Sequence, residues 1–206
     1  MDKNRNSLQI IIKLVMLLFC CLVSQIFSYF VFDDIIVDFF RSGPIVYVIN
    51  RILIAISLYI VSIAIYNRKI NKMQIDVLFM LYSAFVLVFL FLKGNSYTAN
   101  DYHFNLNPIS IITDFKTSNN AVSLLLGNII LYIPFGAYFL FKFRNLQKRY
   151  IILLFVVPLL TEVIQLVAGV GVFDINDIIF NSTGITIGLA LYCLFTKKEE
   201  KRKTFY

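Results

Sequence analysis

Long runs of apolar residues constrain the fold of this chain more than any other feature. Six runs approach the length of about 20 residues that a helix needs to cross the hydrocarbon core of a bilayer. They are Leu8–Phe32, Ile45–Tyr66, Asp76–Leu92, Ala121–Phe141, Tyr150–Ala168 and Asp177–Phe195. The chain is 59% hydrophobic and 15% charged, a balance outside that of soluble domains. We therefore predict an all-α membrane protein, a bundle of about six transmembrane helices forming one integral membrane domain over residues 1–206.

Basic residues are distributed unevenly among the segments that flank these runs. The net charge is +7, and the basic clusters lie before the first run, after the second, after the fourth and in the C-terminal tail. The remaining connections carry mainly aspartates. Cytoplasmic loops of membrane proteins are enriched in Lys and Arg, so six spans with both termini cytoplasmic bring every basic cluster to one side. We attribute this basicity to topology and to contact with membrane lipids, and expect no nucleic-acid partner.

The fifth and sixth runs carry polar side chains along one helical face. Glu162 and Gln165 are three residues apart, and Asp177 and Asn181 are four apart, steps that keep side chains on the same face of a helix. Ionisable groups inside a membrane are costly and usually functional. Asp174, in the connection between the two runs, has a second reading as the N-cap of the last helix.

Four predicted helices place polar side chains at a similar depth. With the orientation above, Arg51, Asn128, Glu162 and Asn181 lie roughly 10 Å below the outer surface, at 1.5 Å per residue. Arg51 is then the expected partner of Glu162, because an unpaired charge at that depth is expensive. Further along the last run, Gly184-xxx-Gly188 predicts a seam of close helix packing. The layer of polar groups predicts a pocket that opens to the outside.

The chemistry open to these groups is limited. Oxygen ligands from Glu162, Asp174, Asp177 and Asn181 would suit a hard cation such as Mg²⁺ or Ca²⁺, although the sequence leaves any metal or cofactor unknown. Two of the carboxylates could share acid–base work, or relay protons across the membrane. The sequence contains no P-loop, dinucleotide fingerprint or recognisable nucleophile–base arrangement.

Several elements taken together resemble the VanZ-like family of membrane proteins. The segment EVIQLVAGVGVFDINDIIFNSTGITIG, from Glu162 to Gly188, is similar to the family pattern of Glu-x-x-Gln, Asp-x-x-Asp and Asn-x-x-Gly-x-x-x-Gly. GNIILYIPFG (127–136) is similar to its Asn…Pro-Phe-Gly helix, and NLNPI (105–109) to its Asn-Leu-x-Pro-Phe loop, with isoleucine replacing phenylalanine. The arginine that many members carry before Asp-x-x-Asp is absent here. The resemblance covers residues 105–195.

The resemblance implies a multi-pass protein of the bacterial plasma membrane, of a type associated with teicoplanin and lipoglycopeptide resistance. One hypothesis is a binding or shielding protein whose pocket engages a lipid, a lipid-linked cell-wall precursor or the acyl tail of the drug. Its ligand-binding residues would be Arg51, Asn128, Gln165, Asp174 and Asn181. A second hypothesis is an intramembrane enzyme acting on a surface lipid or lipid-linked precursor, with Glu162 and Asp177 as catalytic residues. A proton-coupled transporter is the third alternative.

Overall fold

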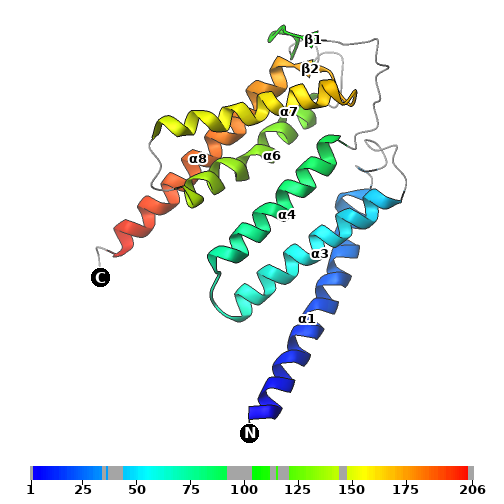
Figure 1. Ribbon diagram of the computed structural model, residues 1–206, viewed down its shortest axis with the longest axis vertical. Coiled ribbons are helices and arrows are strands. Elements are labelled where there is room, and N and C mark those ends of the chain that lie inside the picture. Colours follow the sequence, from blue (N-terminus) through cyan, green and yellow to red (C-terminus); the bar gives the residue numbers. More distant parts are fainter. Residues whose placement is uncertain are drawn as a thin grey trace. The chain divides into compact units, whose positions relative to one another are not determined.

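The computed structural model describes residues 2–33, 36, 44–91, 104–111, 115, 121–143 and 148–203. They belong to two compact units, Met1–Asn95 and Ser96–Tyr206, each built mainly from helices (Figure 1). In the described part of the chain, four helical segments are long and apolar enough to cross a membrane: Ser7–Val31, Ile45–Tyr66, Leu124–Lys142 and Ile175–Thr196. The predicted all-α membrane fold is confirmed, while six spans and cytoplasmic termini stay predictions.

The first unit contains α1 (Asp2–Val31), α3 (Ile45–Tyr66) and α4 (Lys72–Phe91). Helix α3 packs against both α1 and α4. It ends in a Schellman motif, in which the amide of Lys69 donates to the Ala64 carbonyl and the amide of Arg68 to the Ile65 carbonyl, each at 3.0 Å. Arg68 adopts a left-handed conformation, with φ 50°, as this motif requires of the residue after the C-cap.

Helix α4 begins one turn earlier than the apolar pattern predicts. The backbone amide of Asn71 donates to the Gln74 side chain at 2.8 Å, which is half of a capping box. This contact supplies an acceptor for the Asn71 amide, because amides at the start of a helix have no backbone acceptor within the helix. The helix therefore starts at Lys72, because capping and not hydrophobicity decides the boundary.

The described part of the second unit includes α-helices, a 3₁₀ helix and two short strands. These are β1 (Phe104–Asn105), α6 (Ala121–Lys142), η1 (Lys148–Phe155), α7 (Val156–Val167), β2 (Phe173–Asp174) and α8 (Ile175–Lys203). The strands pair in parallel, with Phe104 opposite Phe173 and Asn105 opposite Asp174. They lie at the end of the unit where α7 ends and α8 begins (Figure 1).

The fifth apolar run, predicted as one helix over Tyr150–Ala168, is a 3₁₀ helix followed by α7, which has 12 residues. Pro158 lies in the first turn of α7, where the missing amide hydrogen removes no helical bond. At the other end, Gly169 takes φ 66°, and the amide of Val170 donates to the Gln165 carbonyl at 3.0 Å. Glycine adopts this conformation without steric cost, so α7 stops here and the chain turns into β2.

Helices α6 and α8 pack backbone to backbone. A Cβ atom added at Gly184 would overlap the carbonyl oxygen of Ile129, and one added at Gly188 would overlap that of Ile133. Gly184 lies against Ile129, and Gly188, four residues later, lies against Ile133. Residue numbers therefore rise in the same direction along both helices, which run parallel. The predicted glycine seam is confirmed.

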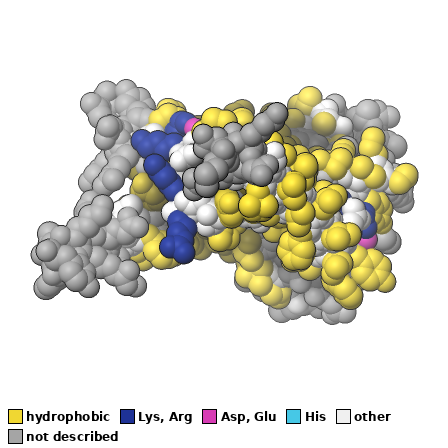
Figure 2. Space-filling view, turned by 90° about the horizontal axis from the view of Figure 1, so that it is seen from below, with side chains coloured by type: hydrophobic (Ala, Val, Ile, Leu, Met, Phe, Trp, Pro, Cys, Tyr) yellow, Lys and Arg dark blue, Asp and Glu magenta, His cyan; other side chains and the backbone are white. Residues whose placement is uncertain are grey.

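Apolar side chains cover much of the outer surface of these helices. Phe19 on α1 and Leu194 on α8 are each 65% exposed, and Val167 on α7 is 77% exposed. Figure 2 is a view from below relative to Figure 1, and hydrophobic side chains cover most of the described surface in it. Exposing so much apolar surface to water would cost free energy, whereas contact with lipid tails would not. The surface therefore agrees with a membrane protein.

Candidate functional site

Asp174 joins three elements of the second unit at the strand pair. One carboxylate oxygen accepts the backbone amide of Asn176 at 2.7 Å, so Asp174 is the N-cap of α8. The other oxygen accepts the side-chain amide of Asn105 in β1 at 2.9 Å. Its own backbone amide donates to the Glu162 carboxylate on α7 at 3.1 Å. Asp174 therefore holds β1, α7 and α8 together.

Glu162 accepts the hydrogen bond that a local capping box would direct to Asp177. In a capping box, the third helical residue accepts the amide of the N-cap, and Asp177 is the third residue of α8. Here the acceptor is Glu162, which comes from a different helix and is only 2% exposed. The cap of α8 thus depends on a tertiary contact.

Helix α7 is amphipathic in the sense expected of a helix in lipid. Its buried side chains are Pro158, Glu162 and Gln165, while Leu160 and Ile164 are each 51% exposed. The buried face is therefore the polar one. This arrangement concentrates costly groups inside the protein and leaves the apolar face for the membrane.

A second set of contacts connects α6 to α7 and α8. The Asn128 side-chain amide donates to the Asp177 carboxylate, and the Tyr132 hydroxyl donates to the Thr161 hydroxyl at 3.1 Å. Asn181 lies one turn beyond Asp177 on the same face of α8 and is 2% exposed. Its side-chain oxygen has no hydrogen-bond partner among the described residues. Asn128 is therefore a hydrogen-bonded link between α6 and α8.

The loop after β1 supplies further polar groups. Both the Asn105 and the Asn176 side-chain amides donate to the Ser110 hydroxyl, each at 2.8 Å. The sequence analysis did not select these three residues as site residues. Asn105 carried a signal, since it begins the NLNPI motif. Ser110 and Asn176 carried none, because single polar residues beside a loop are ordinary.

Exposed apolar side chains lie on the same loop as these polar groups. Phe104 is 57% exposed, and Leu106 and Ile109 are each 64% exposed. We call these three residues the apolar rim. We call Glu162, Asp174 and Asn176, which are joined by hydrogen bonds, the polar cluster. A polar cluster beside an apolar rim can contact both parts of an amphiphilic molecule.

The structure brings together four of the predicted site residues, namely Asn128, Glu162, Asp174 and Asp177, within one unit. Gln165 is buried next to Gly171, where an added Cβ would lie 3.3 Å from the Gln165 Cβ. Asn181 is buried along the α6-facing side of α8.

Arg51 has a partner within the first unit that was not predicted from the sequence. Its guanidinium pairs with Asp33 at 2.6 Å. Asp33 follows the end of α1 and is a nearer partner than any residue of the second unit along the chain. The charge of Arg51 is therefore compensated locally, which removes the reason for the predicted pair.

The cation site stays a possibility that the sequence allows. Within residues that the structure describes, no group of three His, Cys, Asp or Glu side chains is placed to hold a metal ion. The oxygens of Asp174 accept hydrogen bonds from Asn105 and Asn176.

Comparisons with known proteins identify the family of the chain. No solved structure matches the chain. The chain is 32% identical over 123 residues to Protein VanZ of Enterococcus faecium, covering 57% of this chain and 71% of that protein. The sequence profile of the VanZ/LLP1 family matches residues 77–196, which include the strand pair, the glycine seam and the polar cluster. The chain therefore belongs to the VanZ/LLP1 family.

Proposed function

We propose that this chain is a multi-pass protein of the bacterial plasma membrane that lowers sensitivity to teicoplanin-type lipoglycopeptides by binding an amphiphile. In this proposal six helices cross the membrane, both termini are cytoplasmic, and the polar cluster around Asp174 opens outward. The ligand is a membrane lipid, a lipid-linked wall precursor or the acylated drug. Binding at this position would alter access of the drug to its target.

The proposal rests on the arrangement of the loop after β1. Asn105 and Ser110 contact the polar cluster, while Leu106 and Ile109 between them expose apolar side chains. The same loop could thus hold a polar head group on one side and an acyl chain on the other. Family membership supports the link to the cell envelope, because the cluster lies within the matched residues.

The hydrogen bonds of the carboxylates favour binding over catalysis. Glu162 is buried and accepts the backbone amide of Asp174, and Asp177 accepts the amide of Asn128. A general acid or base must reach the proton that it transfers, and these groups instead hold elements of the unit together. Positioning of helices is the role that the geometry supports best.

The test is teicoplanin susceptibility of a sensitive bacterium that expresses the chain at a controlled membrane level. The native chain is expected to raise the inhibitory concentration. Asp177→Asn is expected to retain that effect, since the replacement amide still offers an oxygen to Asn128. Loss of tolerance in Asp177→Asn at an unchanged protein level would favour the enzyme hypothesis. Absence of tolerance with the native chain would contradict the proposed link to the drug.

A substitution in the apolar rim gives a second prediction. The double change Leu106→Ser and Ile109→Ser should weaken acyl-chain binding about a hundredfold and so remove most of the tolerance, because each side chain that an acyl tail covers contributes about 1.5 kcal/mol or more. The two residues are already exposed, so the melting temperature of the purified protein should stay nearly constant. Leu194→Ser, at an equally exposed position of α8 (65%), is the matched control. Equal effects of the rim and control changes would show that the rim has no specific role.

A further inference from the structure

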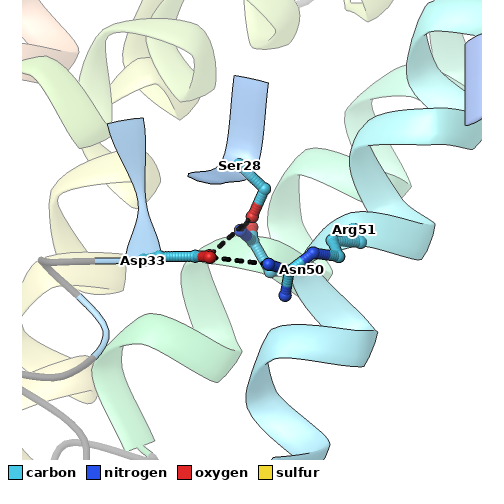
Figure 3. Close-up of polar contacts among 4 residues, drawn as sticks. All are labelled: Ser28, Asp33, Asn50 and Arg51. Carbon is cyan, nitrogen blue, oxygen red and sulfur yellow. Dashed lines mark hydrogen bonds and ion pairs between the residues drawn. The ribbon is translucent and has the colours of Figure 1, made fainter. Parts of the chain in front are cut away.

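A polar cluster between α1 and α3 lies outside the residues matched by the family profile. Figure 3 shows its four members, Ser28, Asp33, Asn50 and Arg51. The Asn50 amide donates to the Ser28 hydroxyl at 3.0 Å, and that hydroxyl donates to Asp33 at 3.1 Å. Arg51 donates to the second oxygen of Asp33 at 2.6 Å. The four side chains thus form a continuous chain of hydrogen bonds between two apolar helices.

Two atoms of this cluster are left over after these bonds are counted. The Asn50 side-chain oxygen and the Arg51 Nε are buried and have no hydrogen-bond partner in the described part of the chain. Asn50 itself is only 3% exposed and Ser28 is fully buried. An unsatisfied polar atom in such a place costs free energy, and the cost is not relieved by lipid tails. The orphaned pair therefore indicates a missing partner.

The chemistry of the two atoms defines that partner. The Asn50 oxygen needs a donor, and the Arg51 Nε–H needs an acceptor. The charges of Arg51 and Asp33 compensate each other, so the cluster has no net attraction for an ion of either sign. A hydroxyl group both donates and accepts and is uncharged. It complements both atoms, as a water molecule would.

Arg51 is a partly exposed member of the cluster. Its side chain is 20% exposed and its guanidinium lies 5.6 Å from the ring centre of Tyr47. Among the described residues its hydrogen bond is to Asp33, whereas Asn50 and Ser28 are buried between the helices.

Position along the helices identifies the source of the hydroxyl. Helix α3 begins at Ile45, so Asn50 lies about 8 Å along it at 1.5 Å per residue. Ser28 is in the last turn of α1, which ends at Val31. Both helices are long enough to cross a bilayer, and this distance from their ends corresponds to the boundary of head groups and hydrocarbon.

We propose that Ser28, Asp33, Asn50 and Arg51 form a second binding site, which takes a hydroxyl group of a lipid head group such as glycerol or a sugar. All four residues precede residues 77–196, which the family profile matches.

The experiment compares two lipids bound to the full-length chain in detergent. Phosphatidylglycerol and phosphatidylmethanol carry the same charge, but only the first has head-group hydroxyls. Titration of each lipid, followed by thermal stability, gives the two affinities. The native chain should bind phosphatidylglycerol about three- to tenfold more tightly, the range expected for one or two added hydrogen bonds.

The variants separate binding from folding. Asn50→Leu should reduce the preference to about one, because it removes the orphaned oxygen. Asn50→Thr keeps a polar partner for Ser28 but lacks the amide oxygen, and it should behave in the same way even where Asn50→Leu fails to fold. Ser57→Ala, whose hydroxyl bonds only to the Leu53 carbonyl of its own helix in the described residues, should retain the native preference. Equal affinities in the native chain, or a preference that survives both Asn50 variants, would overturn the proposal.

Discussion

Gly188→Ala is expected to separate α6 from α8 and to lower the free energy of unfolding by about 2–3 kcal/mol or more. The added methyl group would overlap the carbonyl oxygen of Ile133 and lie 2.9 Å from the Ala137 amide nitrogen. Both contacts are with backbone atoms, which cannot move aside by changing a rotamer. The measurement is unfolding of the purified protein in detergent, followed by circular dichroism.

Gly127→Ala is the matched control for this substitution. Gly127 lies on α6, and a Cβ atom there would meet nothing within 4 Å. Alanine is favoured over glycine within a helix by about 1 kcal/mol, so this change should leave stability equal or slightly higher. A similar loss in both variants would mean that the close α6–α8 contact does not stabilise the second unit.

Asp174→Ala should disconnect the loop after β1 from the start of α8 and cost about 2–4 kcal/mol. The substitution removes the cap of α8 and the acceptor of the Asn105 amide together. The first turn of α8 should fray, so the Asn176 amide should exchange its hydrogen much faster than in the native chain. Hydrogen exchange followed by mass spectrometry measures this directly.

Asp174→Asn tests which property of the residue matters. Asparagine is as good an N-cap as aspartate, so the Asn176 amide keeps an acceptor, and Asn105 can turn its own amide to face the new group. Exchange at Asn176 should therefore stay close to native. Fast exchange in this variant would show that the negative charge near the helix N-terminus, and not the hydrogen bond, stabilises α8.

Tolerance to teicoplanin should follow the same order if the polar cluster is the binding site. Asp174→Ala should lose it, because the rim residues Leu106 and Ile109 are carried by the loop that this substitution releases. Retained tolerance in a protein with a demonstrably frayed α8 would place ligand binding elsewhere on the chain.

The sequence by itself determined those features that depend on neighbours along the chain. Runs of apolar residues defined the helices, since helix length and bilayer thickness are both fixed. Steps of three and four residues put Glu162 with Gln165 on one face of α7, and Gly184 with Gly188 on one face of α8. The N-cap role of Asp174 was also readable, because capping involves residues two positions apart.

Tertiary structure alone decided which polar groups meet. Arg51 pairs with Asp33, and the Asp174 amide donates to Glu162 where a local capping box would use Asp177. Asn105 reaches Asp174 across 69 residues of sequence through the strand pair. Periodicity gives the face on which a side chain lies but not the element packed against that face. In a membrane every buried polar group needs a partner, and only the packing of the helices determines which partner is within reach.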